Sequence, residues 1–236
     1  MGPVLAMNLA RIFCALTAAA LFAVPGCDGR DPASILVGRF STLGNTLLGT
    51  TRKPNDTAIS FTDTSKFAAL RSALQDAGQP VLFVTVNSLG FVDFVSPIGS
   101  NAGVQTWSSA RKVNVSMRDD VLVATRGFGN DLMSAVVPPL ALISSGNGQF
   151  SRSYFALDGG DHTVRSDYSC QFSQSANQTL TILGAIYATR TVLESCSGQR
   201  NSFQNEYWFD QNGRLRQSKQ YFAVRNTSLL IQRIID

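Results

Sequence analysis

Few residues of this 236-residue chain could carry out nucleophilic chemistry. His162 is the only histidine, and it lies in a glycine-rich stretch beside Asp158 and Asp161. A catalytic triad would need an activated serine close to it, and the sequence contains no GxSxG motif. We therefore interpret His162 as a turn residue in solvent. The sequence predicts no catalytic residues.

Paired carboxylates are the remaining route to catalysis, because a glycosidase needs only two suitably spaced acids. The candidates by residue type are Asp158, Asp161, Glu194, Glu206 and Asp210. Each of them is also typical of a surface or a turn. A polysaccharide-modifying hydrolase is therefore kept as an alternative function.

The N-terminal residues indicate export. Ile12 to Val24 is an uncharged apolar run after Arg11, which is typical of a signal peptide and shorter than the roughly 20 apolar residues that span a bilayer. The following Pro25-Gly26-Cys27 completes a sequence that resembles the bacterial lipobox, so Cys27 is the predicted lipidation site. Ordinary cleavage near Gly26 would instead leave a soluble periplasmic protein. The predicted organisation is a lipoprotein signal peptide (1–26), a lipidated tether (27–34) and a single mainly-β periplasmic domain (35–236).

Cys170 and Cys196 then remain as a pair in an oxidising compartment, where a disulfide is the expected state. A metal site would lack ligands, because the chain has one histidine and no CxxC motif. The sequence therefore predicts a disulfide between these residues, no metal and no cofactor.

Charge and composition restrict the partners. The chain carries 20 basic and 16 acidic residues, and the basic residues are scattered singly. This distribution favours a solvated surface and predicts no nucleic acid partner.

The predicted partner is instead a membrane, through the lipid anchor, and the predicted location is the periplasmic face of the outer membrane. Asp28, directly after Cys27, resembles the signal that retains lipoproteins in the inner membrane of enteric bacteria, which is the alternative location.

The elements that must position these residues are mostly strands. The stretch from 104 to 133 contains a predicted hairpin, in which residues 112–117 and 121–125 are strands and 118–120 is the turn. Asp63 to Ala77 is the clearest helix, and a weaker helical pattern covers 35–48. Further strands are predicted at 81–86, 90–95, 150–157, 162–172, 180–195 with a bend near Gly184, 202–209, 214–224 and 228–234. Val136 to Ser145 surrounds a double proline and is interpreted as an extended crossover. About ten strands after one or two N-terminal helices predict a mainly-β fold, an antiparallel barrel-like or sandwich domain.

Two segments together resemble a known family. The first is Trp107 followed by the hairpin that ends in Val123-Ala124-Thr125-Arg126-Gly127-Phe128-Gly129-Asn130-Asp131-Leu132. The second runs from Phe203 to Gly213 and includes Asn205-Glu206-Tyr207-Trp208, with Ser218 and Gln220 after it. With the lipoprotein start, these segments resemble the YjbF/GfcB lipoproteins of exopolysaccharide and group 4 capsule gene clusters. The resemblance implies a β-barrel-like fold, an outer-membrane lipid anchor that faces the periplasm, and a role in polysaccharide production or export. It implies no enzymatic activity.

The leading hypothesis is a non-enzymatic lipoprotein that assists exopolysaccharide or capsule production or secretion. Its partners would be the polysaccharide or other proteins of the export cluster, and a structural assembly factor for an outer-membrane barrel is a further alternative. Aromatic rings beside polar groups suit the CH surfaces of sugars, although strand alternation makes the side chains of Trp208 and Tyr207 point to opposite faces of the sheet. The residues proposed to contact glycan or partner are Trp107, Arg126, Tyr207, Trp208 and Asp210.

Overall fold

The computed structural model describes residues 64–158, 160–223 and 227–236. The predicted signal peptide, Cys27, the tether and the expected helix at 35–48 lie outside these residues. The first described element is helix α2 (Thr64–Asp76), and the 3₁₀ turn η1 (Asn87–Leu89) and helix α3 (Leu140–Ser145) follow later. The strands are β1 (Val81–Val86), β2 (Phe91–Asn101), β3 (Val104–Ser109), β4 (Asn114–Arg118), β5 (Val121–Arg126), β6 (Leu132–Val136), β7 (Gln149–Leu157), β8 (Thr163–Gln174), β9 (Gln178–Ile182), β10 (Ala185–Gly198), β11 (Ser202–Asp210), β12 (Leu215–Ala223) and β13 (Thr227–Ile235).

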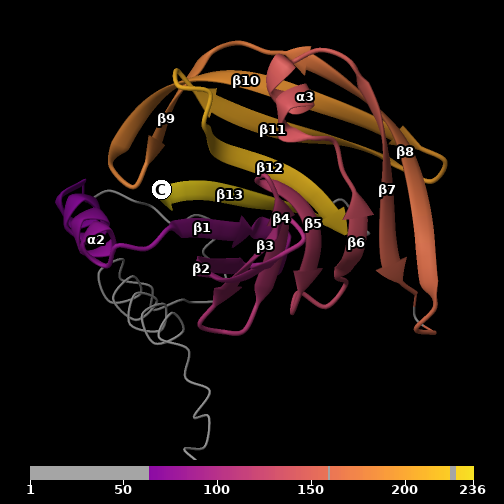
Figure 1. The fold of residues 1–236 in the computed structure, drawn as a ribbon, viewed down its shortest axis with the longest axis horizontal. Coiled ribbons are helices and arrows are strands. Elements are labelled where there is room, and N and C mark those ends of the chain that lie inside the picture. The colour runs from indigo at the N-terminus through magenta and orange to yellow at the C-terminus, as the bar shows by residue number, and fades with distance from the viewer. Residues whose placement is uncertain (1–63, 159, 224–226) are drawn as a thin grey trace, which may run out of the picture.

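The strands form one antiparallel, nearly closed sheet. Its order is β5-β4-β3-β2-β1-β13-β12-β11-β10-β8-β7-β6, and β9 pairs with β10 beside this path. The two strands at the ends of this order, β5 and β6, lie side by side. Figure 1 shows the strands curving round into a barrel-like shape. The predicted mainly-β barrel-like fold is therefore confirmed.

Helix α2 is the N-terminal helix predicted at residues 63–77. Phe67, Leu70 and Leu74 are buried, as expected for an apolar stripe with helical spacing. Leu70 and Leu74 pack with Ile182 of β9 and with outward-facing residues of β1, β2 and β13. Arg71 fixes this contact, because its guanidinium donates hydrogen bonds to the carbonyl oxygens of residues 182, 183 and 234. The helix therefore covers the outer face of the sheet near the C-terminus.

The segment from 136 to 145 differs from the predicted extended crossover. The chain forms β6 up to Val136 and then the short helix α3, which starts directly after Pro139 and ends at Gly146 with φ +63°. Proline is well suited to a helix start, because the amide hydrogen that it lacks would have no partner within the helix there. The double proline therefore introduces a helix.

The segment from 180 to 195 is also more sharply divided than predicted. Leu183 and Gly184 both have positive φ angles and join β9 to β10 in a two-residue hairpin rather than a bend. In contrast, β2 is longer than the strand predicted at 90–95, because it continues through Pro97 and Gly99 with an irregular register at that point.

The predicted hairpin at 112–125 is confirmed as β4 and β5. Val113, Val115 and Met117 are buried together on one face, as their alternation predicts. Asp119 and Asp120 both have positive φ angles, as the two central residues of a type I′ turn require.

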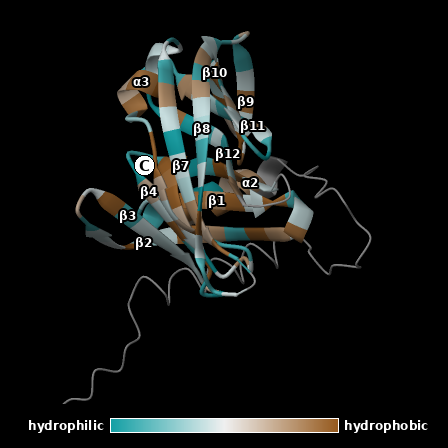
Figure 2. Ribbon diagram, turned by 90° about the vertical axis from the view of Figure 1, so that its right-hand side faces the viewer, coloured by the Kyte–Doolittle hydropathy of each residue, from teal (hydrophilic) through white to brown (hydrophobic). Residues whose placement is uncertain are grey.

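Most of the apolar side chains lie inside the curved sheet. The largest cluster joins residues from β1 to β5 with residues of β7, β8, β10, β12 and β13. A second internal cluster lies under α3, where Ile143 packs with Phe172, Val192 and Phe209. Figure 2 shows hydrophobic residues alternating with hydrophilic ones along the strands. No helix in the described part of the chain is long and apolar enough to cross a membrane.

Candidate functional site

The disulfide predicted from the sequence is present and buried. Cys170 on β8 and Cys196 on β10 are register partners on adjacent strands, with their Cα atoms 4.0 Å apart and both side chains inside the sheet. The carboxylate of Glu194 lies next to the two sulfur atoms. Because the sulfur atoms are bonded to each other, they are not the free thiolates that bind metal ions.

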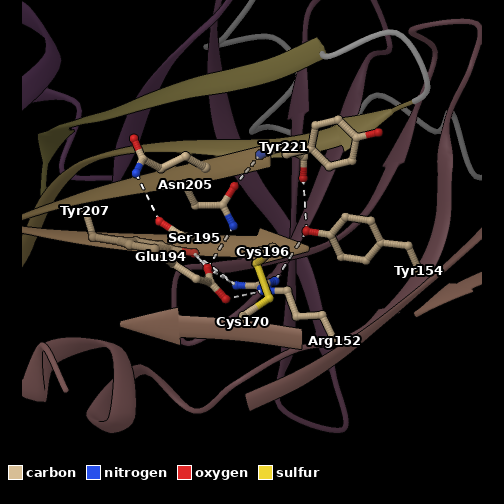
Figure 3. Close-up of a disulfide and its surroundings, with 10 residues drawn as sticks. Arg152, Tyr154, Cys170, Glu194, Ser195, Cys196, Asn205, Tyr207 and Tyr221 are labelled. Carbon is tan, nitrogen blue, oxygen red and sulfur yellow. Dashed lines mark hydrogen bonds and ion pairs between the residues drawn. A yellow bond between two sulfur atoms is a disulfide. The ribbon is translucent and has the colours of Figure 1, made fainter. Parts of the chain in front are cut away.

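A fully buried ion pair lies beside the disulfide, as Figure 3 shows. Arg152 on β7 and Glu194 on β10 are 1% and 0% exposed. The guanidinium makes two parallel hydrogen bonds to the carboxylate, Nε to Oε1 at 2.5 Å and Nη2 to Oε2 at 2.8 Å. This bidentate geometry is the strongest form of an arginine–carboxylate contact. The ion pair joins β7 to β10 across the intervening strand β8.

Two residues of β11 complete the surroundings of Glu194. The Asn205 side chain donates to Oε2 at 2.8 Å, and the Tyr207 hydroxyl donates to the same oxygen at 2.8 Å. Tyr207 also accepts a hydrogen bond from Arg152 Nη2 at 3.0 Å. Both residues belong to the N-x-Y-W sequence on which the family resemblance rests. The motif therefore positions two hydrogen-bond donors for the buried carboxylate of Glu194.

The protonation states agree with this arrangement. Burial, followed by the charge of Glu194, raises the pKa of Tyr207 well above its ordinary value, so its hydroxyl stays a donor. Burial also raises the pKa of Tyr154 to about 12. Burial alone would lower the pKa of Arg152, but its contacts with Tyr154, Tyr207 and Glu194 outweigh burial and raise it. The raised pKa values therefore keep Arg152 positively charged and the Tyr154 and Tyr207 hydroxyls protonated at neutral pH.

The same network continues to β12. The Asn205 side-chain oxygen accepts a hydrogen bond from the Tyr221 amide at 2.7 Å, and the Tyr154 hydroxyl donates to the Tyr221 carbonyl at 3.2 Å. Gln220, the residue before Tyr221 on β12, reaches across the interior to the β4–β5 hairpin. It accepts from the Leu122 amide and donates to the Asp120 carbonyl, at 2.9 and 3.0 Å. Gln220 therefore links β12 to the β4–β5 hairpin through the interior.

The other half of the family pattern closes the sheet. Asp131, between β5 and β6, accepts hydrogen bonds from the Thr125 hydroxyl and from the amides of Gly127 and Phe128. The Thr125 hydroxyl oxygen in turn accepts from the Leu132 amide at 3.0 Å. The Arg126 guanidinium donates to the carbonyls of residues 132 and 133. We call this contact between β5 and β6 the seam, and side chains make it where the strand ladder is missing.

The residues proposed as glycan or partner contacts lie in different environments. Trp107 and Tyr207 are buried in the internal clusters, and Trp208 is 6% exposed on the outer side, where its Nε1 donates to Gln178. These three rings have structural contacts and offer no open face for stacking. Arg126 is exposed at the seam, and Asp210 accepts a 2.7 Å hydrogen bond from Arg216 at the β11–β12 turn. The structure does not gather the five residues into one site.

The five candidate carboxylates are also dispersed. Glu194 is buried with Arg152, Glu206 pairs with Lys219 at 3.3 Å, and Asp210 pairs with Arg216. Asp158 accepts hydrogen bonds from the amides of residues 160 and 162 in the β7–β8 turn, where Asp161 also lies. The His162 side chain is 81% exposed in that turn, as predicted.

A small cavity lies at the end of the sheet near the C-terminus. Its volume is about 10 Å³, and Asp120 and Arg233 are among its lining residues. Arg233 is ion-paired with Asp120, while its Nε atom is buried without a hydrogen-bond partner in the described part of the chain. Burial raises the pKa of Asp120, although the neighbouring Arg233 opposes the shift. The space suits about one water molecule and is too small for a sugar.

Arg152 is the residue that the sequence interpretation missed. Its signal was its place between Phe150 and Tyr154, because alternation along β7 puts all three on the apolar face. A charge in that position requires a buried partner. The identity of the partner, 42 residues away, comes only from the structure.

Comparisons with known proteins agree with the fold and the motifs. A family model described as group 4 capsule polysaccharide lipoprotein gfcB, YjbF, matches residues 55–234. Among solved structures, the hypothetical lipoprotein YmcC from Escherichia coli K12 is similar with a TM-score of 0.63 and 19% identity, over 75% of this chain and 96% of that chain. A putative exported protein with a YmcC-like fold from Bacteroides fragilis matches with a TM-score of 0.30 and 10% identity, over 66% of this chain and 93% of that chain. Comparison with curated protein sequences gave no match.

Proposed function

Because the chain belongs to the YjbF family of group 4 capsule polysaccharide lipoproteins, we propose that it assists the production or secretion of an exopolysaccharide or capsule without catalysing a reaction. The family match is the observation that carries this proposal. It covers the described sheet up to residue 234 and includes both motifs whose side chains build the interior network. The protein would act by binding the polysaccharide or by supporting another protein of the export machinery.

The placement of the acids supports a non-enzymatic role. A glycosidase needs two carboxylates that face the same bound sugar, one of them able to hold or release a proton. Glu194 is enclosed and bound by Arg152, Asn205 and Tyr207. Of the other four candidates, two are paired with basic residues and two lie in the β7–β8 turn. The alternative of a polysaccharide-modifying hydrolase therefore gains no support from the described residues.

The proposed location is a membrane surface that faces the periplasm. A lipoprotein of this family is expected there, and Cys27 within its lipobox-like sequence supplies the attachment point. We propose the outer membrane, with retention in the inner membrane as the alternative that Asp28 suggests. Cell fractionation of a Cys27→Ala variant tests the anchor. Release into the soluble periplasm is expected, and a variant that stays in the membrane fraction would contradict lipidation.

Deletion of the gene tests the role itself. Surface polysaccharide should fall under conditions that induce the cluster, and a wild-type copy should restore it. The assay is the amount of high-molecular-mass polysaccharide extracted from the cell surface. An unchanged amount of surface polysaccharide in the deletion strain would contradict the proposal.

A further inference from the structure

The outer face of four adjacent strands carries two rows of small neutral polar side chains. In the first row, serines are register partners across β7, β8, β10 and β11: Ser151, Ser169, Ser197 and Ser202. In the second row, the register partners are Gln149, Gln171, Ser195 and Gln204. All eight side chains are exposed. We call these eight residues the Ser/Gln face.

The hydrogen-bonding groups of this face are largely free. Gln204 donates to the Ser195 hydroxyl at 3.1 Å, and the other six side chains have no protein partner in the described part of the chain. Strand spacing makes the array about 14 Å wide across four strands and about 7 Å along them. The face therefore presents a regular lattice of hydroxyl and amide groups, each able to donate and to accept.

The face is bounded by charge but contains none. The exposed ion pair Arg165–Asp167 lies next to it on β8, and the pair Lys219–Glu206 lies beyond it on β12 and β11. These neighbours show that charged residues occur on the same sheet surface outside the two rows. In Figure 2, β7 and β8 run in front, and hydrophilic residues recur along both.

The interior beneath the face is cross-linked by the disulfide and by a buried ion pair. Cys170 lies between Ser169 and Gln171, and Cys196 lies between Ser195 and Ser197, so the disulfide connects two strands directly under both rows. The Arg152–Glu194 ion pair lies under the same strands. A surface that is already ordered loses little conformational entropy when a ligand binds.

The chemistry of the face selects one class of occupant. Protein interfaces are enriched in aromatic residues, methionine and arginine at their centre and depleted of serine, which is the opposite of this composition. Nucleic acids and anionic lipids require basic side chains, and the hydrocarbon of a membrane requires apolar ones. A chain of uncharged sugar units carries many hydroxyl groups, which match an array of serine and glutamine side chains in both donors and acceptors.

We propose that the Ser/Gln face is the polysaccharide-binding surface of this protein, and that it recognises an uncharged, hydroxyl-rich stretch of the glycan. The proposal rests on the proposed function and makes it more specific, since it assigns glycan binding to β7, β8, β10 and β11. Trp107, Tyr207 and Trp208 then support the fold and do not contact the glycan.

A direct test uses the full chain purified in detergent and the high-molecular-mass polysaccharide from the organism that encodes it. The face variant is Ser169→Ala, Ser195→Ala and Ser197→Ala. The matched control is Ser100→Ala, Thr179→Ala and Thr181→Ala, which changes three exposed polar residues on β2 and β9. Both variants should melt near the wild-type temperature, because surface substitutions have small effects on stability.

The face variant should bind at least about tenfold more weakly than the wild type, because several hydrogen bonds to the ligand are lost. The control should bind like the wild type, and the affinity should change little with salt because no charge is involved. Equal binding by the face variant and the wild type would overturn the proposal. A strong loss of affinity in salt would also overturn it.

Two further outcomes separate this inference from the proposed function. If the wild type does not bind the polysaccharide while gene deletion still lowers surface polysaccharide, the face proposal is wrong and the pathway role stands. A photo-crosslinking residue placed at Ser197 in polysaccharide-producing cells should capture glycan. Capture of a polypeptide or of a second copy of the chain would assign the face to a protein partner and overturn the proposal.

Discussion

The wall formed by β7, β8, β10 and β11 and the seam between β5 and β6 are held together in different ways. The wall has continuous strand ladders, a disulfide and a buried ion pair that joins β7 to β10 across β8. The seam has no ladder, and Thr125, Arg126 and Asp131 connect it through side-chain hydrogen bonds. The two motifs of the family pattern are divided between these regions. The comparison indicates that the wall is the rigid part of the molecule and the seam is the part that opens most easily.

The largest effect is expected at the centre of the wall. Glu194→Ala would leave the Arg152 charge buried without a partner, which costs about 3 to 5 kcal/mol of unfolding free energy. Urea denaturation measures it. Replacing both residues, as Arg152→Met with Glu194→Met, should be less damaging than Glu194→Ala alone, because no unpaired charge remains. A loss below about 1 kcal/mol in the single variant would show that the ion pair does not hold the wall.

The second-largest loss of stability is expected when the disulfide is removed. The two cysteines are 26 residues apart, and in the chain-entropy model a loop of this length contributes about 3 to 4 kcal/mol. The variant Cys170→Ala with Cys196→Ala should therefore unfold at a clearly lower urea concentration. Reduced wild type provides the comparison, since it should approach the stability of the variant. If all three proteins unfold together, the cross-link adds nothing to the wall.

The seam should respond more weakly and more locally. Asp131→Ala removes the acceptor of three hydrogen bonds and should cost about 2 kcal/mol. Hydrogen exchange should accelerate in β5 and β6 while the amides of β8 and β10 stay protected. Equal acceleration in both regions would contradict the distinction between wall and seam.

The smallest effect is expected at Asp210, in the turn that follows β11. Hydrogen bonds from Arg216 and from the amides of residues 212 and 214 lower the pKa of Asp210 despite the opposing effect of burial. Since its folded-state pKa lies below the ordinary 3.8, its contribution is present above that pH and is lost as the pH falls through the lowered value. Asp210→Asn should therefore be less stable by under about 1 kcal/mol at neutral pH. Thermal unfolding at several pH values measures the difference, which should shrink in acid. A stability difference that stays constant with pH would contradict a lowered pKa for Asp210 in the folded protein.

Much of the fold could be predicted from local patterns. Alternation at Val113, Val115 and Met117 and the residues of the Asp119-Asp120 turn identified β4 and β5. The disulfide also followed from compartment and cysteine count. The prediction of an extended crossover failed because Pro138-Pro139 is compatible with both an extended chain and a helix start. Only the packing of Ile143 of α3 against the internal cluster decides between them.

The interior network could be predicted only in part. From its residue type, Glu194 is predicted to be typical of a surface or a turn, although it has the same strand parity as Cys196, and a buried disulfide implies the inner face for both. Arg152 has the parity of Phe150 and Tyr154. Nothing local connects these two charges, because they meet across a strand that lies between them in the sheet. Likewise, the rows of the Ser/Gln face depend on registers between strands, which the sequence alone does not fix.

The amount of surface polysaccharide in an acid-replacement strain tests the central claim most directly. The chromosomal gene would encode Asp158→Asn, Asp161→Asn, Glu206→Gln and Asp210→Asn together, which removes every candidate catalytic carboxylate outside the buried ion pair. Immunoblotting would establish that the variant accumulates like the wild type. A non-enzymatic lipoprotein predicts wild-type polysaccharide in this strain and a reduced amount in the deletion strain. A reduced amount in both, at normal protein level, would contradict it and favour the hydrolase.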